Sequence, residues 1–65
     1  MQTDIQRLAA FYRQRSIEAA AKLAADAAAY AADPSMRNGV SVELSHQFFL
    51  REYYAAEAYE THRNR

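Results

Sequence analysis

Apolar residues recur along residues 4–32 with the spacing of an amphipathic helix. Placed about 100° apart around a helix axis, residues of one face are almost all apolar. This face holds Ile5, Leu8, Ala9, Tyr12, Ala19, Leu23, Ala27 and Tyr30. A neighbouring stripe holds Ala10, Ile17, Ala21, Ala24 and Ala28, while the polar back carries Arg7, Gln14, Arg15, Glu18 and Lys22, with Phe11 among them. The pattern predicts a helix whose apolar surface is wider than one neighbouring helix can cover.

Residues 41–62 are apolar nearly all the way round. One stripe holds Leu44, Phe48, Ala55 and Tyr59, a second holds Val42, Phe49, Tyr53 and Ala56, and a third holds Leu50, Tyr54 and Ala58. No alternation of apolar and polar residues runs through the segment, so a strand is not expected. A helix of this kind needs neighbours on several sides.

Signals for the ends of the two helices are clear. Thr3 and Gln6 have the spacing of a capping box, which predicts a first helix over about 4–32. The single Pro and the single Gly lie in the pairs Asp33-Pro34 and Asn38-Gly39, which favour turns, and Ser41 is a candidate cap. We therefore expect a loop over 33–40 and a second helix over about 41–62. The fold class predicted for 1–65 is all-α, a single two-helix antiparallel hairpin.

The small size of the chain favours self-association. A chain of 65 residues is marginally stable alone, and the absence of Cys removes disulfides as a support. We expect a homodimeric four-helix bundle. The predicted core of the hairpin or dimer is Ile5, Leu8, Tyr12, Leu23, Tyr30, Leu44, Phe48 and Tyr59.

Apolar surface remains after such a core is assigned. Surplus aromatic side chains with arginine nearby are typical of protein-binding surfaces. The candidate partner-binding residues are Phe11, Arg37, Phe49, Leu50, Arg51, Tyr53 and Tyr54. For Leu50 and Tyr54, a place in the dimer core is the open alternative.

Charge argues against a general polyanion binder, because eight basic side chains balance eight acidic ones. An antiparallel hairpin would still gather arginines at one end, namely Arg7, Arg13, Arg15, Arg63 and Arg65. These are the candidate residues for binding nucleic acid or an acidic partner. A solvated end, with cations favoured by the helix dipole, is the alternative that we prefer.

Catalytic and membrane signatures are missing from the sequence. A single Gly rules out a glycine-rich phosphate loop, and His46 and His62 both lie in the second helical segment, so no Ser-His-Asp arrangement has a scaffold. We expect no enzymatic activity, no cofactor and no metal site. The sequence also lacks a long apolar run and a signal-peptide pattern, so we expect a soluble cytoplasmic protein without membrane contact.

The predicted arrangement of a long capped helix from Thr3, an Asn38-Gly39 turn and a second helix from Ser41 resembles the small helical-hairpin dimers of phages and plasmids. One kind is the plasmid Rop protein, a four-helix bundle that binds paired RNA loops. The other kind is the small phage inhibitors of host proteins, such as quorum-sensing anti-activators. The resemblance covers the whole chain but is architectural, and it implies either an inhibitor or adaptor of a host protein or, as the alternative, a Rop-like regulator. A structural subunit of a larger assembly is a further alternative.

Overall fold

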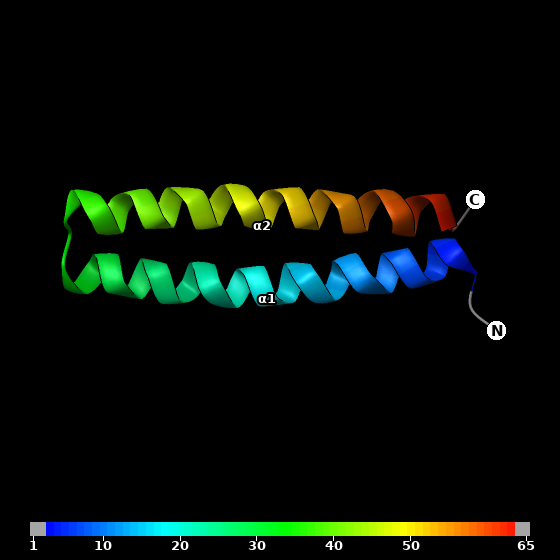
Figure 1. The fold of residues 1–65 in the computed structure, drawn as a ribbon, viewed down its shortest axis with the longest axis horizontal. Coiled ribbons are helices and arrows are strands. Elements are labelled where there is room, and N and C mark those ends of the chain that lie inside the picture. The colour runs from blue at the N-terminus through cyan, green and yellow to red at the C-terminus, as the bar shows by residue number, and fades with distance from the viewer. Residues whose placement is uncertain (1–2, 64–65) are drawn as a thin grey trace.

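The protein is an antiparallel hairpin of two long helices (Figure 1). The computed structural model describes residues 3–63, and their side chains as far as Thr61. Helix α1 spans Asp4–Ala32 and helix α2 spans Met36–Arg63. They lie side by side along their full lengths, and the Cα atoms extend over 47 × 16 × 12 Å. The predicted all-α hairpin is confirmed, and no strand occurs among the described residues.

Helix α1 begins and ends where the sequence predicts. The Thr3 hydroxyl accepts a hydrogen bond from the Gln6 backbone N–H (3.1 Å), and the Gln6 side chain accepts one from the Thr3 backbone N–H (2.8 Å). This reciprocal box satisfies two N–H groups that a helix start leaves without partners. At the other end, Asp33 adopts extended backbone angles, as expected of the residue before Pro34, and its N–H still donates to the Ala29 carbonyl.

Helix α2 starts at Met36, so the predicted loop over 33–40 and the predicted start at Ser41 are wrong. Ser35 occupies the capping position instead, because its hydroxyl accepts a hydrogen bond from the Asn38 N–H (3.1 Å). The Asn38 side chain lies inside the first turn and donates to the Asp33 carbonyl (2.9 Å). The Ser41 hydroxyl donates back to the Arg37 carbonyl within the helix. The connection is therefore only Asp33, Pro34 and Ser35.

Gly39 lies in the first turns of α2, where the lack of a side chain makes room for Tyr30. A Cβ atom at this position would lie 3.3 Å from Cε2 of the Tyr30 ring. The φ angle of Gly39 is not positive, so glycine is not required here by a turn. It leaves room for the Tyr30 side chain of α1.

The surface between the helices follows a heptad pattern built largely from small and polar residues. We call it the seam: Ile5, Ala9, Tyr12, Ser16, Ala19, Leu23, Asp26 and Tyr30 on α1 face Asn38, Val42, Ser45, Phe49, Glu52, Ala56 and Tyr59 on α2. Successive members are four and three residues apart, as in a coiled coil. Ala56 is 0% exposed, Ala9 and Ala19 are nearly as buried, and no large side chain of the described residues is fully buried. Small side chains let the helices approach closely, but they provide little apolar burial.

Polar contacts across the seam set the register of the two helices. Arg13 makes two hydrogen bonds to Glu60, at 2.9 and 2.7 Å, and Arg15 binds Glu52 at 3.1 Å. Nearer the loop, the Ser45 hydroxyl donates to the Asp26 carboxylate. The rings of Tyr12 and Tyr59 stack with centroids 5.5 Å apart.

Candidate interaction surfaces

The predicted core residues divide between the seam and the surface. Ile5, Tyr12, Leu23 and Tyr59 are half-buried between the helices. Tyr30 belongs to the seam by position, yet it is exposed beside the loop. Leu8, Leu44 and Phe48 lie outside the seam, and Leu44 is 60% exposed. The hairpin alone therefore leaves these three without a core, and their place in a dimer interface stays a prediction.

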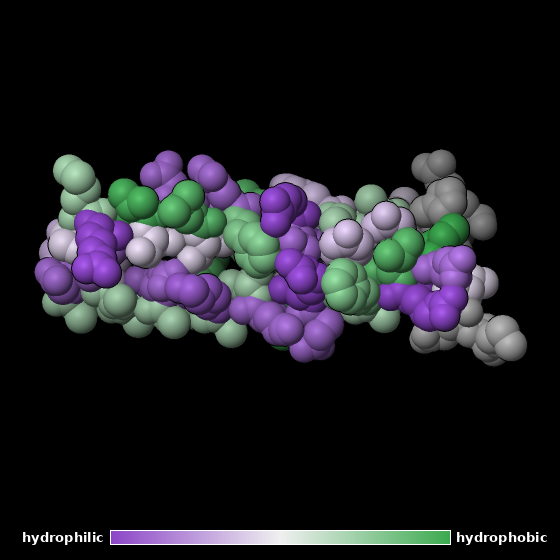
Figure 2. Space-filling model, in the orientation of Figure 1, coloured by the Kyte–Doolittle hydropathy of each residue, from purple (hydrophilic) through white to green (hydrophobic). Residues whose placement is uncertain are grey.

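Five large apolar side chains share one face of the hairpin, which we call the groove face: Leu8, Phe11, Val40, Leu44 and Phe48. All five are exposed. Their positions follow helical spacing on each helix, and Phe11 and Phe48 are linked across the seam by the Arg15 guanidinium, which lies 5.5 and 5.7 Å from the two ring centroids. Figure 2 shows hydrophobic side chains along α2 towards the loop and along α1 towards the opposite end, with hydrophilic ones between.

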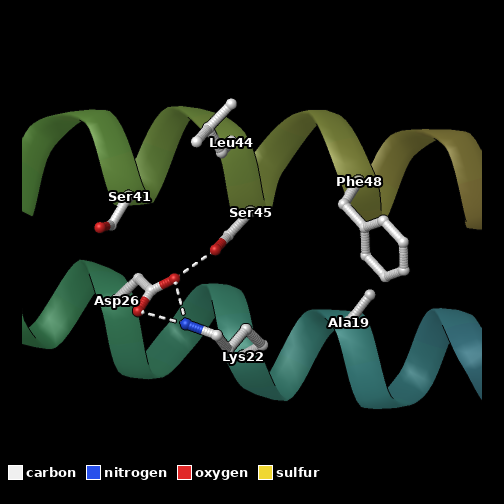
Figure 3. A pocket seen from close by; sticks show the side chains of 7 residues that line it. All are labelled: Ala19, Lys22, Asp26, Ser41, Leu44, Ser45 and Phe48. Atoms are coloured by element: carbon white, nitrogen blue, oxygen red, sulfur yellow. Dashed lines mark hydrogen bonds and ion pairs between the residues drawn. The ribbon is translucent and has the colours of Figure 1, made fainter.

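A shallow groove of about 390 Å³ opens on this face near the loop (Figure 3). Leu44 and Phe48 stand on its α2 side, and Ala19 and Lys22 line it from α1. At its floor, Asp26 accepts hydrogen bonds from Lys22 Nζ at 2.8 Å and from the Ser45 hydroxyl. These two bonds, that from Lys22 first, lower the pKa of Asp26 below its ordinary value of 3.8. The groove therefore has apolar side chains on its α2 side, and the Asp26 carboxylate at its floor already has hydrogen-bond partners.

Glu52 marks the middle of the same face. Its carboxylate is only 5% exposed and accepts hydrogen bonds from Arg15, with Arg51 at 3.5 Å. The hydrogen bond to Glu52 raises the pKa of Arg15. Arg51 also lies 5.1 Å from the centroid of the Phe48 ring. Guanidinium groups and aromatic rings thus alternate along the groove face, in an arrangement typical of cation–π contacts.

A second surface on α2, which we call the tyrosine surface, consists of Leu50, Tyr53 and Tyr54, of which Tyr54 is exposed and the other two are half-buried. Tyr54 is 62% exposed. The edge of one ring contacts the face of the other in the Tyr53–Tyr54 pair, with centroids 5.6 Å apart, and the Arg13 guanidinium lies 5.4 Å from the Tyr53 ring. A hydrogen bond to Glu57 raises the pKa of the Tyr53 hydroxyl. Tyr53 thus contacts Tyr54, Arg13 and Glu57, whereas most of the Tyr54 side chain faces solvent.

The predicted partner-binding residues fall on both surfaces and in the seam. Phe11 and Arg51 lie on the groove face, while Leu50, Tyr53 and Tyr54 form the tyrosine surface. Phe49 is half-buried at a seam position, where it contacts the Tyr53 ring at 5.7 Å between centroids. Arg37 is exposed in the first turn of α2. The seven residues therefore do not form one continuous binding surface on the hairpin.

The arginines predicted to bind nucleic acid are paired with carboxylates wherever their side chains are described. Arg7 pairs with Asp4, Arg13 with Glu60 and Glu57, and Arg15 with Glu52. Hydrogen bonding to Glu60 raises the pKa of Arg13. The side chain of Arg63 and the whole of Arg65 lie outside the described residues. The end of the hairpin therefore presents neutralised ion pairs, at least as far as Thr61.

Sequence reasoning missed the polar residues that hold the seam together. Glu52 and Ser16 are buried, and Asp26 and Ser45 bond to each other between the helices. A search for apolar stripes ignores such residues. The alternating spacing of four and three residues through Ala9, Tyr12, Ser16 and Ala19 is a signal that could have identified the seam.

Reactive groups do not gather in the described part of the chain. The side chains described between Thr3 and Thr61 contain no cluster of three or more His, Asp or Glu placed to hold a metal ion. Over the same residues, neither helix has the length and apolar character needed to cross a bilayer. What the described surface offers is exposed apolar and aromatic area on two sides of the hairpin.

Comparison with known proteins does not assign the chain to a family: no family model, no curated protein and no solved structure matches it.

Proposed function

We propose that this protein is a small, non-catalytic inhibitor or adaptor that binds another protein through the tyrosine surface. The observation that carries the proposal is Tyr54, which is 62% exposed on α2 and whose ring contacts the ring of Tyr53. Tyrosine contributes strongly to protein interfaces because a large, partly polar ring loses little conformational entropy on binding. An exposed aromatic pair on the surface of a soluble protein commonly marks an interaction site.

The chemistry of the surface indicates the kind of partner. Leu50 adds aliphatic area beside the two rings, and the Tyr54 hydroxyl can donate to or accept from a polar group at the rim. Glu57 and Arg13 flank Tyr53 with opposite charges. The surface therefore suits an apolar groove or patch on a protein with hydrogen-bonding groups at its edge, and it has no excess of either charge.

The architectural likeness to phage and plasmid hairpin dimers supports an inhibitor or adaptor role, and a host protein is the partner we propose. A Rop-like role in binding RNA has less support, because Arg7, Arg13 and Arg15 are each engaged by a carboxylate. Binding to phosphates would need those ion pairs to open.

The test is affinity capture from a bacterial lysate with three forms of the chain: wild type, Tyr54→Ala and Met36→Ala. Met36 is the matched control because it is an apolar residue on the same helix, 87% exposed and remote from the tyrosine surface. We expect the wild type and Met36→Ala to capture the same protein, and nuclease treatment should not reduce the amount captured. Tyr54→Ala should reduce that amount at least about tenfold, the loss typical of a hot-spot residue.

Circular dichroism shows whether the variants are folded. Tyr54→Ala should retain full helicity, since most of its side chain is in solvent. Capture that is equal for Tyr54→Ala and wild type, or that disappears with nuclease, would contradict the proposal.

A further inference from the structure

The groove face presents five large apolar side chains that the hairpin alone leaves exposed. Among the described residues the only buried apolar side chains are three alanines, and the larger apolar residues of the seam are half-buried. In contrast, five large side chains are exposed on one side of the hairpin: Leu8, Phe11, Val40, Leu44 and Phe48. A chain of 65 residues with a core of small side chains is expected to be only marginally stable, so additional burial would stabilise it. The five side chains are spread along most of the hairpin, whose Cα atoms extend over 47 × 16 × 12 Å.

Large and small residues alternate on this face in a way that is complementary to itself. Towards the loop, α2 carries the bulky Val40 and Leu44, while spacing from Lys22 puts Ala25 and Ala29 on the same side of α1. Towards the other end the sizes reverse. There α1 carries Leu8 and Phe11, and α2 carries Ala55 and Ala58. Val40 and Leu44 therefore lie near alanines of α1, and Phe11 lies near an alanine of α2, whereas Phe48 lies opposite Lys22.

Such a face can pack on a copy of itself in two symmetric ways. If the two loops lie at the same end, α1 of each copy packs against α2 of the other, so Leu44 meets Ala25 and Phe11 meets Ala58. If the loops lie at opposite ends, each helix packs against its own equivalent. With the loops at the same end, Leu44 and Phe11 each meet a small side chain from the same distance along the hairpin. With the loops at opposite ends, each meets a small one from the opposite end of the hairpin.

Charge distinguishes the two arrangements. Glu18 lies one turn beyond Arg15, and Arg51 directly precedes Glu52; because Arg15 binds Glu52, Glu18 and Arg51 lie near the same level at mid-length. Both side chains are exposed at the outer border of the groove face. With the loops together, Glu18 of each copy meets Arg51 of the other. With the loops apart, Glu18 meets Glu18 and Arg51 meets Arg51, which is repulsive.

We propose that a second copy of this chain covers the groove face, with both loops at the same end, to form a four-helix bundle flanked by two Glu18–Arg51 ion pairs. The Arg15–Glu52 pairs enter the interior of the bundle already hydrogen-bonded, which avoids burying an unpaired charge. The interface leaves Leu50, Tyr53 and Tyr54 on the outside, so it is independent of the partner-binding role proposed above.

Charge reversal tests the contacts. Glu18→Arg and Arg51→Glu should each weaken the dimer, measured by sedimentation equilibrium, by about tenfold in Kd, because two ion pairs per dimer become repulsive. The double variant with both changes should return to near the wild-type Kd, which a simple folding defect would not do. A wild-type chain that is monomeric at all concentrations, or a double variant that stays as weak as the single ones, would overturn the proposal.

Spin labels test the orientation, and the absence of native Cys makes single labelling sites simple. Ala31→Cys places a label near the loop end, and Ala21→Cys places the control near mid-length, both at exposed positions. With the loops together, the label-to-label distances of the two variants should be similar. A distance for Ala31→Cys that exceeds the control by tens of ångströms, approaching the 47 Å length of the hairpin, would mean that the loops lie at opposite ends and would refute the orientation.

Discussion

The packing of α1 against α2 depends on alanine at positions where most hairpins would place leucine or isoleucine, and this makes Ala56 the most informative site for mutation. Ala56 is 0% exposed, at the same heptad face as Glu52 and Phe49. In Ala56→Leu the larger side chain has no space unless the helices separate. Separation would in turn lengthen the Arg15–Glu52 and Arg13–Glu60 contacts on either side of it.

The expected cost follows from overpacking a tight interface, about 1–3 kcal/mol. A chain of 65 residues has a total stability of about 3–10 kcal/mol, so the loss is a large fraction of it. For a domain of this size each kcal/mol lowers Tm by about 4–8 °C, which predicts a decrease of roughly 5–20 °C.

The assay is thermal and urea unfolding followed by helix ellipticity, repeated at several protein concentrations so that any effect of self-association is seen. Ala21→Leu is the matched control, because it makes the same substitution at an exposed position of α1. Its stability should stay within about 0.5 kcal/mol of wild type. If Ala56→Leu were as stable as Ala21→Leu, the close approach of the helices through alanine would be refuted.

Two further predictions concern the second helix start and the groove floor. Ser35→Ala should destabilise the protein by about 1 kcal/mol in urea unfolding, because it removes the acceptor for the Asn38 N–H, whereas Ser41→Ala should have little effect; the reverse order would indicate that the helix begins at Ser41. Because Lys22 and Ser45 hold the pKa of Asp26 below 3.8, the stabilising contribution of Asp26 is fully present above its ordinary pKa and is lost as the pH falls through its lowered, folded-state value. Wild type should therefore lose more stability than Asp26→Asn between about pH 5 and pH 2, and parallel unfolding profiles for the two proteins would count against this interaction.

Signals near the helix ends could be read from the sequence where one local interaction decides the outcome. The capping box of Thr3 and Gln6 is such a case, and so is the end of α1 before Asp33 and Pro34. The start of α2 could not be read in the same way. Asn38-Gly39 is a turn signal by composition, but the Asn38 side chain binds the preceding connection and Gly39 makes room for Tyr30, so the pair fits into a helix.

The division of α2 into buried and exposed stripes could not be settled from apolar residues, because the helix is apolar on three sides. The stripe that packs in the seam is the one with Val42, Phe49 and Ala56. Its choice depends on polar partners on the other helix, namely the bonds of Arg15 to Glu52 and of Asp26 to Ser45. These are pairwise contacts between distant residues, and a single-helix pattern does not contain them.

The helical ends at Asp4 and Arg63 lie together at one end of the hairpin, opposite the connection at Asp33, Pro34 and Ser35 (Figure 1). This position has a consequence for gene fusion. In a bundle with both loops at the same end, the end of α2 at Arg63 of one copy would lie near the start of α1 at Asp4 of the other, so a short flexible peptide could join two copies into one chain. In the opposite orientation the linker would have to run the 47 Å length of the molecule. The shortest linker that yields a stable, concentration-independent fold would therefore report how the copies are oriented.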